Sequence, residues 1–213
     1  MTSKIKSSPE ITADLASKDH AMAWLMQQCD PVEVTLHEDY FASLASAIVG
    51  QQLSNKVADV LWERLKRLVE GQVSPETILC LDDEKIREIG ISYAKIKYLK
   101  SLAYAIASGS LSFDDFHLLK DHEVRASLCS VKGIGPWTAE MFLIFSLGRL
   151  DIFSMGDAGL QRAVKWLYGL EESPSKKELL EISNNWAPYR TIASLYLWKA
   201  LDGELMSKTK AGE

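Results

Sequence analysis

The chain has 213 residues, of which 47% are hydrophobic and 25% are charged. This composition excludes a disordered chain, and the apolar runs are too short for a membrane span or a signal peptide, so we expect a soluble, intracellular protein. The formal net charge of −5 opposes general electrostatic attraction to nucleic acid, so any contact with DNA has to be local.

Helical periodicity and helix-end signals run along the chain, whereas strand-like alternation is absent. The sequence therefore predicts an all-α fold, a compact bundle of short helices that follows a polar N-terminal arm. The helix from Pro136 to Gly148 is apolar almost all round and is expected in the centre of the molecule. The expected helices cover about residues 21–29 and 38–49, and others begin at Ser54, Ser74, Asp82 or Asp83, Ser92, Ser112, Asp121, Pro136, Asp157, Ser175 and Pro188.

Metal and cofactor sites are not expected. The three cysteines are widely separated, the four histidines lack ligand spacing, and no Walker, EF-hand or H-E-x-x-H pattern occurs. We expect no cofactor and no metal held by side chains. Lys95, Lys97 and Lys100 form one basic cluster, which is equally typical of a solvated helix face.

The segment "KGIG", residues 132–135, separates two helical patterns. Gly133 and Gly135 permit positive φ and close backbone approach, and Ile134 can anchor the turn in the core. The turn leads into a helix N-terminus, where unpaired N–H groups and partial positive charge suit a phosphate. Alone, this pattern is more typical of a plain turn between antiparallel helices.

The wider context resembles a known family. The segment "LCSVKGIGPWTA" is similar to the helix-hairpin-helix element of DNA repair glycosylases, and "GD" before a helix resembles the signature of their superfamily. The branch most similar is 3-methyladenine DNA glycosylase II in its compact form. Four motifs carry this resemblance: "IVGQQLS" (48–54), "GIGPWTAEMFL" (133–143), "DIFSMGD" (151–157) and "APYRTIASLYLW" (187–198).

The resemblance implies a helix-hairpin-helix DNA glycosylase fold in which residues 1–213 form a single unit of two helical lobes. The first lobe is expected at about 41–132 and the second at about 1–40 plus 133–213. The helix-hairpin-helix motif then covers about 122–147, with Lys132, Gly133, Ile134 and Gly135 as the DNA-binding hairpin.

Asp157 is the candidate catalytic residue. As an N-cap it would stabilise the following helix by about 1 kcal/mol. As the family's catalytic carboxylate it would face the deoxyribose of an extruded nucleotide and stabilise positive charge or orient water. Both roles can hold together. Asp151 is the local competitor and is expected in a turn or in an ion pair with Arg149.

The resemblance also implies a base pocket formed by Trp137, Met141 and Tyr189. Electron-rich rings favour the cationic N3- or N7-alkylated purines, although core aromatic residues are the alternative. Relatives with lyase activity have a lysine where Trp137 stands, and the clustered cysteines of the endonuclease III branch are missing. Met141 departs from the aromatic residue of well-known relatives.

Residues of the "GQQLS" loop are candidates to fill the duplex after base flipping. Gln52 matches the wedge in position, whereas Leu53 is more apolar and is alternatively a hydrophobic staple before Ser54. Arg190 is expected either to contact phosphate or brace the pocket, or to form an ordinary surface salt bridge.

The expected function is therefore that of a monofunctional DNA glycosylase. It would release alkylated purines, namely 3-methyladenine and 7-methylguanine, from double-stranded DNA and leave an abasic site. Alternatives are a glycosylase for ethenoadenine, hypoxanthine or an oxidised base, and a non-catalytic DNA-binding module. We expect a monomer, with no membrane association, in the cytoplasm at the nucleoid or in the nucleus.

Overall fold

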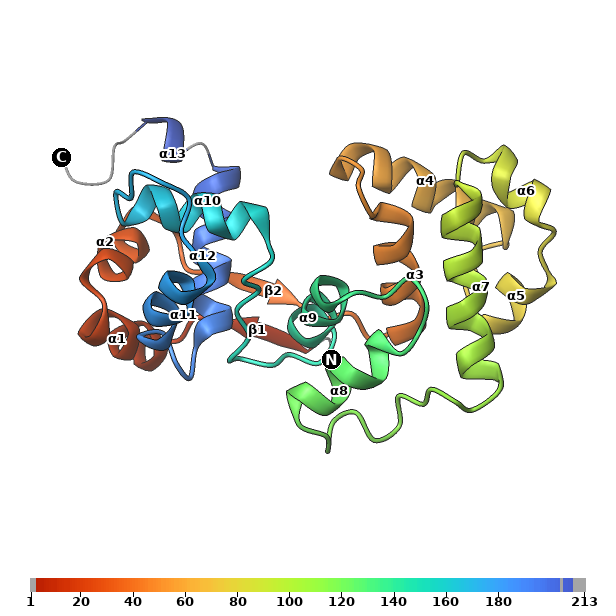
Figure 1. Ribbon diagram of the computed structural model, residues 1–213, viewed down its shortest axis with the longest axis horizontal. Helices are drawn as coiled ribbons and strands as arrows, with labels where there is room; N and C mark the ends of the chain where they lie inside the picture. The colour runs from red at the N-terminus through yellow and green to blue at the C-terminus, as the bar shows by residue number, and fades with distance from the viewer. Residues whose placement is uncertain (1–2, 204, 209–213) are drawn as a thin grey trace. The chain divides into compact units, whose positions relative to one another are not determined.

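The structure is a computed structural model that describes residues 3–203 and 205–208. Its helices, labelled in Figure 1, belong to two compact units. Unit 1 combines the two ends of the chain, up to Leu36 and from Gly148 onwards, and unit 2 is the continuous segment His37–Leu147. Each unit has its own core and is described separately.

Unit 1 contains a two-stranded antiparallel sheet and six helices within the described residues. The strands pair with Lys4 opposite Thr35 and Lys6 opposite Glu33. Each strand has only three residues, so the predicted all-helical character is confirmed apart from this short ribbon. The elements are β1 (Lys4–Lys6), α1 (Pro9–Lys18), α2 (His20–Gln28), β2 (Glu33–Thr35), α10 (Ala158–Leu167), α11 (Lys176–Asn184), α12 (Arg190–Asp202) and α13 (Leu205–Lys208).

Helix α12 lies in the core of unit 1, where every side chain from Thr191 to Leu197 is buried. A buried carboxylate links three parts of this unit. Asp19 caps α2 by accepting from the Met22 N–H at 2.9 Å, and it also accepts from the Trp186 indole at 2.9 Å and from the Tyr168 hydroxyl. Burial, together with this bond to Asp19, raises the pKa of Tyr168.

All of the secondary structure that is described in unit 2 is helical. An aromatic cluster packs under α9, where the Tyr40 ring lies 5.3 Å from Phe142 and the Phe113 ring lies 5.5 Å from Phe116, measured between centroids. The helices are α3 (Tyr40–Gly50), α4 (Asn55–Leu68), α5 (Pro75–Cys80), α6 (Asp83–Glu88), α7 (Tyr93–Ala107), α8 (Asp121–Cys129) and α9 (Pro136–Phe145).

Several expected helix starts differ from the observed ones. Ser112 begins no helix, because its hydroxyl accepts from the Asp114 N–H at 3.1 Å and closes a local turn instead. Lys120, rather than Asp121, is the N-cap of α8, and its N–H donates to Glu123 at 2.8 Å. The last long helix begins at Arg190, two residues after Pro188.

The N-terminal segment is not merely a polar arm. It contains β1 and α1, whose N-cap Ser8 accepts from the Ile11 N–H at 3.4 Å and whose Leu15 is fully buried. The boundary between the units also differs from the expected one, since it lies at Leu147 and not at residue 132. The reason is packing: α9 follows the hairpin and contacts α3 and α8, so it belongs to unit 2.

None of the described helices combines the length and the apolar character needed to cross a membrane.

Candidate functional site

Asp157 lies at the N-terminus of α10. Its Oδ1 accepts from the Leu160 N–H at 2.8 Å and lies 3.4 Å from the indole nitrogen of Trp198. The backbone N–H of Asp157 donates to the Ser154 carbonyl at 3.0 Å. The half-buried carboxylate is therefore held by a backbone donor and a side-chain donor from two helices, α10 and α12.

Local sequence explains why this carboxylate is held so closely. A Cβ atom at Gly159 would lie 3.0 Å from Asp157 Oδ1 and 3.1 Å from Leu201, so a side chain there would crowd the carboxylate. Gln161 fixes the preceding turn by donating to the Met155 carbonyl at 2.8 Å. The sequence pointed to Asp157 but not to Gly159 or Trp198. Trp198 lies 41 residues from Asp157 and gives no local signal.

Asp151 contacts Arg190. It accepts from the Arg190 guanidinium at 3.4 Å and from the Arg190 N–H at 3.4 Å. Arg190 also donates to the Ser183 carbonyl and the Asn184 side chain, both at 3.2 Å. The Arg190 side chain therefore links Asp151 to the chain segment that precedes α12.

Tyr189 occupies the N-cap position of α12 and is half-buried. Its N–H donates to the Trp186 carbonyl at 2.7 Å, and Trp186 is fully buried. The Trp186 ring packs edge-on against Phe153 at 5.2 Å between centroids. The backbone of Tyr189 is therefore anchored to the core of unit 1.

The hairpin lies in unit 2 between α8 and α9. Gly133 has φ +98°, and a Cβ atom there would lie 2.2 Å from Cγ of Tyr98 on α7. Only glycine fits both the backbone conformation and this contact. Ile134 is 4% exposed and anchors the turn in the core, as expected for the middle residue of the hairpin.

Gly135 differs from Gly133. It is the N-cap of α9 with φ −95°, and a Cβ atom there would have no heavy atom within 4 Å. No side chain of the described residues caps this helix, and Pro136 occupies its first turn. The exposed Lys132 precedes the two glycines. The N-terminus of α9 is thus open on the side of Gly135.

The two candidate pocket residues of unit 2 lie one turn apart on α9. Trp137 is 43% exposed, although the rest of this helix is largely buried. Met141 is half-buried. A large exposed aromatic side chain on a mostly buried helix is better suited to a ligand contact than to a core, which favours the pocket interpretation of Trp137.

The "GQQLS" loop is tied to the hairpin. Gln51 donates from its side chain to the Gly133 carbonyl at 2.8 Å, and Lys95 donates to the Val49 carbonyl at 2.7 Å. Burial lowers the pKa of Lys95. Directly after these anchors, Gln52 is exposed and has φ +58°, an unusual conformation for a residue with a side chain. Leu53 is 37% exposed.

The structure thus groups the predicted residues within each unit. Unit 2 joins the candidate wedge loop to the hairpin through Gln51, and unit 1 joins Asp157 to Trp198. Among the residues that the structure describes, no three His, Cys, Asp or Glu side chains gather in a way that could hold a metal ion. The catalytic, pocket and wedge roles of the named residues stay predictions.

Comparison with known proteins identifies the family to which this chain belongs. Residues 45–188 match the HhH-GPD superfamily base excision DNA repair protein family. This match covers more than half of the chain and includes the hairpin and the Asp157 turn. The chain therefore belongs to the HhH-GPD superfamily of base excision DNA repair proteins.

One curated relative and two solved structures make the comparison more specific. The chain is 34% identical over 176 residues to a protein of Bacillus subtilis (strain 168) named "Putative DNA-3-methyladenine glycosylase YfjP", covering 79% of this chain and 61% of that protein. The chain thus spans less than two thirds of that relative's length.

The solved structures match over nearly the whole chain. A DNA-3-methyladenine glycosidase from Bacillus halodurans has a TM-score of 0.86 and 39% identity, with 98% of this chain and 96% of the other covered. A Schizosaccharomyces pombe 3-methyladenine DNA glycosylase in complex with abasic DNA has a TM-score of 0.81 and 33% identity, with coverage of 91% and 97%.

Proposed function

We propose that this protein is a monofunctional DNA glycosylase for alkylated purines. It hydrolyses the N-glycosidic bond of 3-methyladenine and 7-methylguanine in double-stranded DNA and leaves an abasic site for base excision repair. Family membership and the names of the relatives support the activity. The observation that carries it is the fixed Asp157 carboxylate, because pure DNA binding needs no such group.

The reaction breaks the bond between C1′ of the deoxyribose and a ring nitrogen of the purine, and the bonding electrons leave with the base. Positive charge develops on the sugar, where the ionised Asp157 carboxylate stabilises it. A water molecule adds its oxygen to C1′ and passes one proton to the surrounding solvent. The Leu160 and Trp198 donors keep Asp157 Oδ1 in place, so little reorganisation accompanies the charge development.

Base selection rests on charge and not on a network of polar contacts. Purines alkylated at N3 or N7 are cationic, so their rings are attracted to the faces of electron-rich aromatic side chains. Trp137 and Tyr189 supply such rings, and Met141 supplies a polarizable surface that adapts to different bases. An alkylated base is also an activated leaving group, so this chemistry proceeds without a dedicated general acid.

The hairpin and the "GQQLS" loop of unit 2 hold the DNA. The hairpin residues Lys132–Gly135 dock a backbone phosphate, because the N-terminus of α9 is left open at Gly135. Gln52 or Leu53 enters the minor groove to replace the flipped nucleotide. Trp137 cannot form the Schiff base that a lysine forms in strand-cleaving relatives, so no lyase step follows.

The test is release of free bases from methylated duplex DNA by the wild type and by Asp157→Asn, with binding to an abasic-site duplex measured alongside. We expect the wild type to release 3-methyladenine and 7-methylguanine. The variant should release them at least about 100-fold more slowly while binding abasic DNA normally. Absence of release by the wild type would reject the proposal, and release of ethenoadenine, hypoxanthine or an oxidised base instead would reassign the substrate.

We further propose that the protein acts as a monomer and works where the DNA is, in the cytoplasm at the nucleoid or in the nucleus. Sedimentation equilibrium at micromolar concentration tests the first point, with 23.8 kDa as the expected mass. Fractionation of the host cell with antibody detection tests the second. A dimer mass, or recovery in the membrane fraction, would contradict these expectations.

A further inference from the structure

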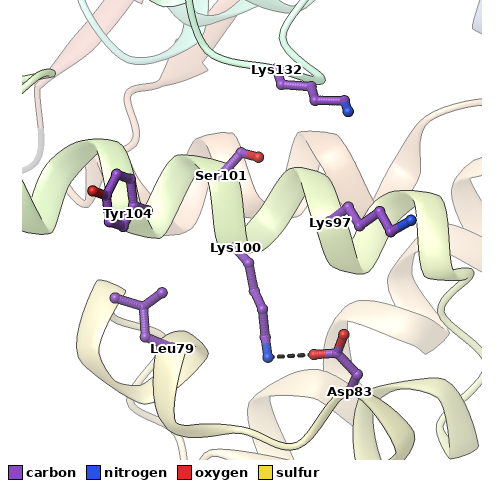
Figure 2. A pocket seen from close by; sticks show the side chains of 7 residues that line it. All are labelled: Leu79, Asp83, Lys97, Lys100, Ser101, Tyr104 and Lys132. Atoms are coloured by element: carbon purple, nitrogen blue, oxygen red, sulfur yellow. Dashed lines mark ion pairs between the residues drawn. The ribbon is translucent and has the colours of Figure 1, made fainter.

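Next to the hairpin, two adjoining pockets lie along helix α7, and we call them together the α7 groove. One part is a pocket of about 430 Å³ (Figure 2) lined by Leu79, Asp83, Lys97, Lys100, Ser101, Tyr104 and Lys132. A second pocket of about 390 Å³ shares three of these residues and adds Ala105, Ser110, Ser130 and Val131. All of these residues belong to unit 2.

The lining of the α7 groove is basic although the protein is acidic overall. Three lysines and one aspartate line it, whereas the whole chain has a net charge of −5. Lys100 is committed to the structure, because it pairs with Asp83 and donates to the Leu81 carbonyl at 3.0 Å. The local excess of positive charge therefore comes from Lys97 and Lys132.

Lys97 and Lys132 are available to a ligand. Both side chains are exposed, and within the described part of the chain neither forms an ion pair or a hydrogen bond. In the view of Figure 2 the side chains of Lys97 and Lys132 both point to the right, whereas Lys100 points down towards Asp83. Two uncommitted cations in one groove fit a ligand that carries more than one negative charge.

The remaining lining fits the sugar and phosphate groups of a nucleic acid strand. Ser101 supplies a hydroxyl group, and serine hydroxyls commonly bond phosphate oxygens in protein–DNA interfaces, whereas the Ser110 and Ser130 hydroxyls already donate to the Ala105 and Ser127 carbonyls. The Tyr104 side chain is 67% exposed. The lining therefore offers two exposed ammonium groups, one hydroxyl donor and one open aromatic ring to a ligand.

The α7 groove is continuous with the hairpin. Lys132 is the first hairpin residue and lines both pockets, and the next residue, Gly133, packs directly against Tyr98 of α7. A DNA strand with one phosphate at the N-terminus of α9 presents its further phosphates at intervals of about 3.4 Å along the axis of the DNA duplex. We propose that the α7 groove binds phosphates of the duplex that flank the one held by the hairpin, so that the DNA footprint extends along α7.

This inference rests on the proposed function only in taking duplex DNA as the ligand. The test is equilibrium binding to a duplex with a tetrahydrofuran abasic analogue between 50 and 200 mM KCl. The variant is Lys97→Gln, and the matched control is Lys120→Gln. Lys120 is an exposed lysine of the same unit and is the N-cap of α8, about 13 Å along that helix from the end that leads into the hairpin.

We expect Lys97→Gln to bind about fivefold more weakly at low salt and to reduce the slope of log K against log [salt] by about 0.9. Lys120→Gln should match the wild type. Shortening one duplex arm should weaken the wild type but have little further effect on Lys97→Gln, since both changes remove the same contact. The proposal fails if Lys97→Gln binds the long duplex with wild-type affinity and slope.

Two further outcomes are informative. If inorganic phosphate at constant ionic strength competes for the Lys97-dependent part of binding and arm length has no effect, the α7 groove takes free phosphate and the proposal is overturned. The duplex contains no base at the lesion, so binding is measured independently of catalysis. A wild type that releases no alkylated base but shows the Lys97-dependent arm effect would reject the proposed function and leave this inference standing.

Discussion

The N-termini of α9 and α10 differ in what occupies them. At α10 the side chain of Asp157 fills the N-terminus and accepts from the Leu160 N–H at 2.8 Å. At α9 the N-cap is Gly135, no side chain of the described residues caps the helix, and a Cβ atom would meet open space. The contrast is between two helix N-termini: α10 holds an anion that belongs to the protein, whereas α9 leaves room for an external anion, which we propose is a DNA phosphate.

The first prediction separates the two roles of the filled N-terminus. Serine is as good an N-cap as aspartate, so Asp157→Ser should change the free energy of unfolding by less than about 0.5 kcal/mol. Loss of the carboxylate should nevertheless slow base release about 1000-fold. Urea unfolding and single-turnover excision measure the two effects. A variant that is destabilised and still active would mean that Asp157 is only a cap.

The second prediction concerns the hairpin glycine that packs against the protein itself. Gly133→Ala would place Cβ 2.2 Å from Cγ of Tyr98 at φ +98°. Overpacking and backbone strain together should lower the free energy of unfolding by about 3 kcal/mol, or the melting temperature by about 10 °C. Thermal unfolding checks this. An unchanged melting temperature would contradict the close packing of the hairpin on α7.

The third prediction concerns the hairpin glycine that faces open space. Gly135→Ala should lower the free energy of unfolding by only about 0.5–1 kcal/mol, since alanine is a poorer N-cap than glycine and meets no neighbour. Binding to abasic-site DNA should fall about tenfold, because the methyl group stands where a phosphate approaches the α9 amides. Anisotropy titrations measure the change, and wild-type binding by Gly135→Ala would place the phosphate elsewhere.

Sequence reasoning reached those parts of the molecule that local chemistry determines. Ser92 caps α7 and the Ser175 to Glu178 box caps α11, both as the residue pattern indicates. The Asp157 cap and the buried Ile134 follow in the same way. Each of these features depends on residues within four positions of one another, so it can be inferred without knowledge of the tertiary structure.

The features that sequence reasoning missed depend on distant contacts. The strands β1 and β2 have three residues each, which is too few for alternation to be visible, and Lys4 finds Thr35 only in the folded chain. Ser112 carries a helix-start signal, but the following Phe113 joins the cluster around Phe142 and the chain turns. Trp198 reaches Asp157 from another helix, and no local pattern marks it.

The last and smallest effect tests the loop that carries the candidate wedge. Gln52 has φ +58°, and the residues just before it are held by the hydrogen bonds of Gln51 to Gly133 and of Lys95 to Val49. Gln52→Gly should relieve the backbone strain and raise the free energy of unfolding by about 0.5–1 kcal/mol. If Gln52 is the wedge, the same variant should slow excision from duplex DNA several-fold but leave excision from single strands unchanged, because only a duplex has a gap to fill.

Leu53→Ala is the matched comparison. A duplex-specific loss in Leu53→Ala but not in Gln52→Gly would transfer the wedge role to Leu53, and the strain at Gln52 would then serve to present its neighbour.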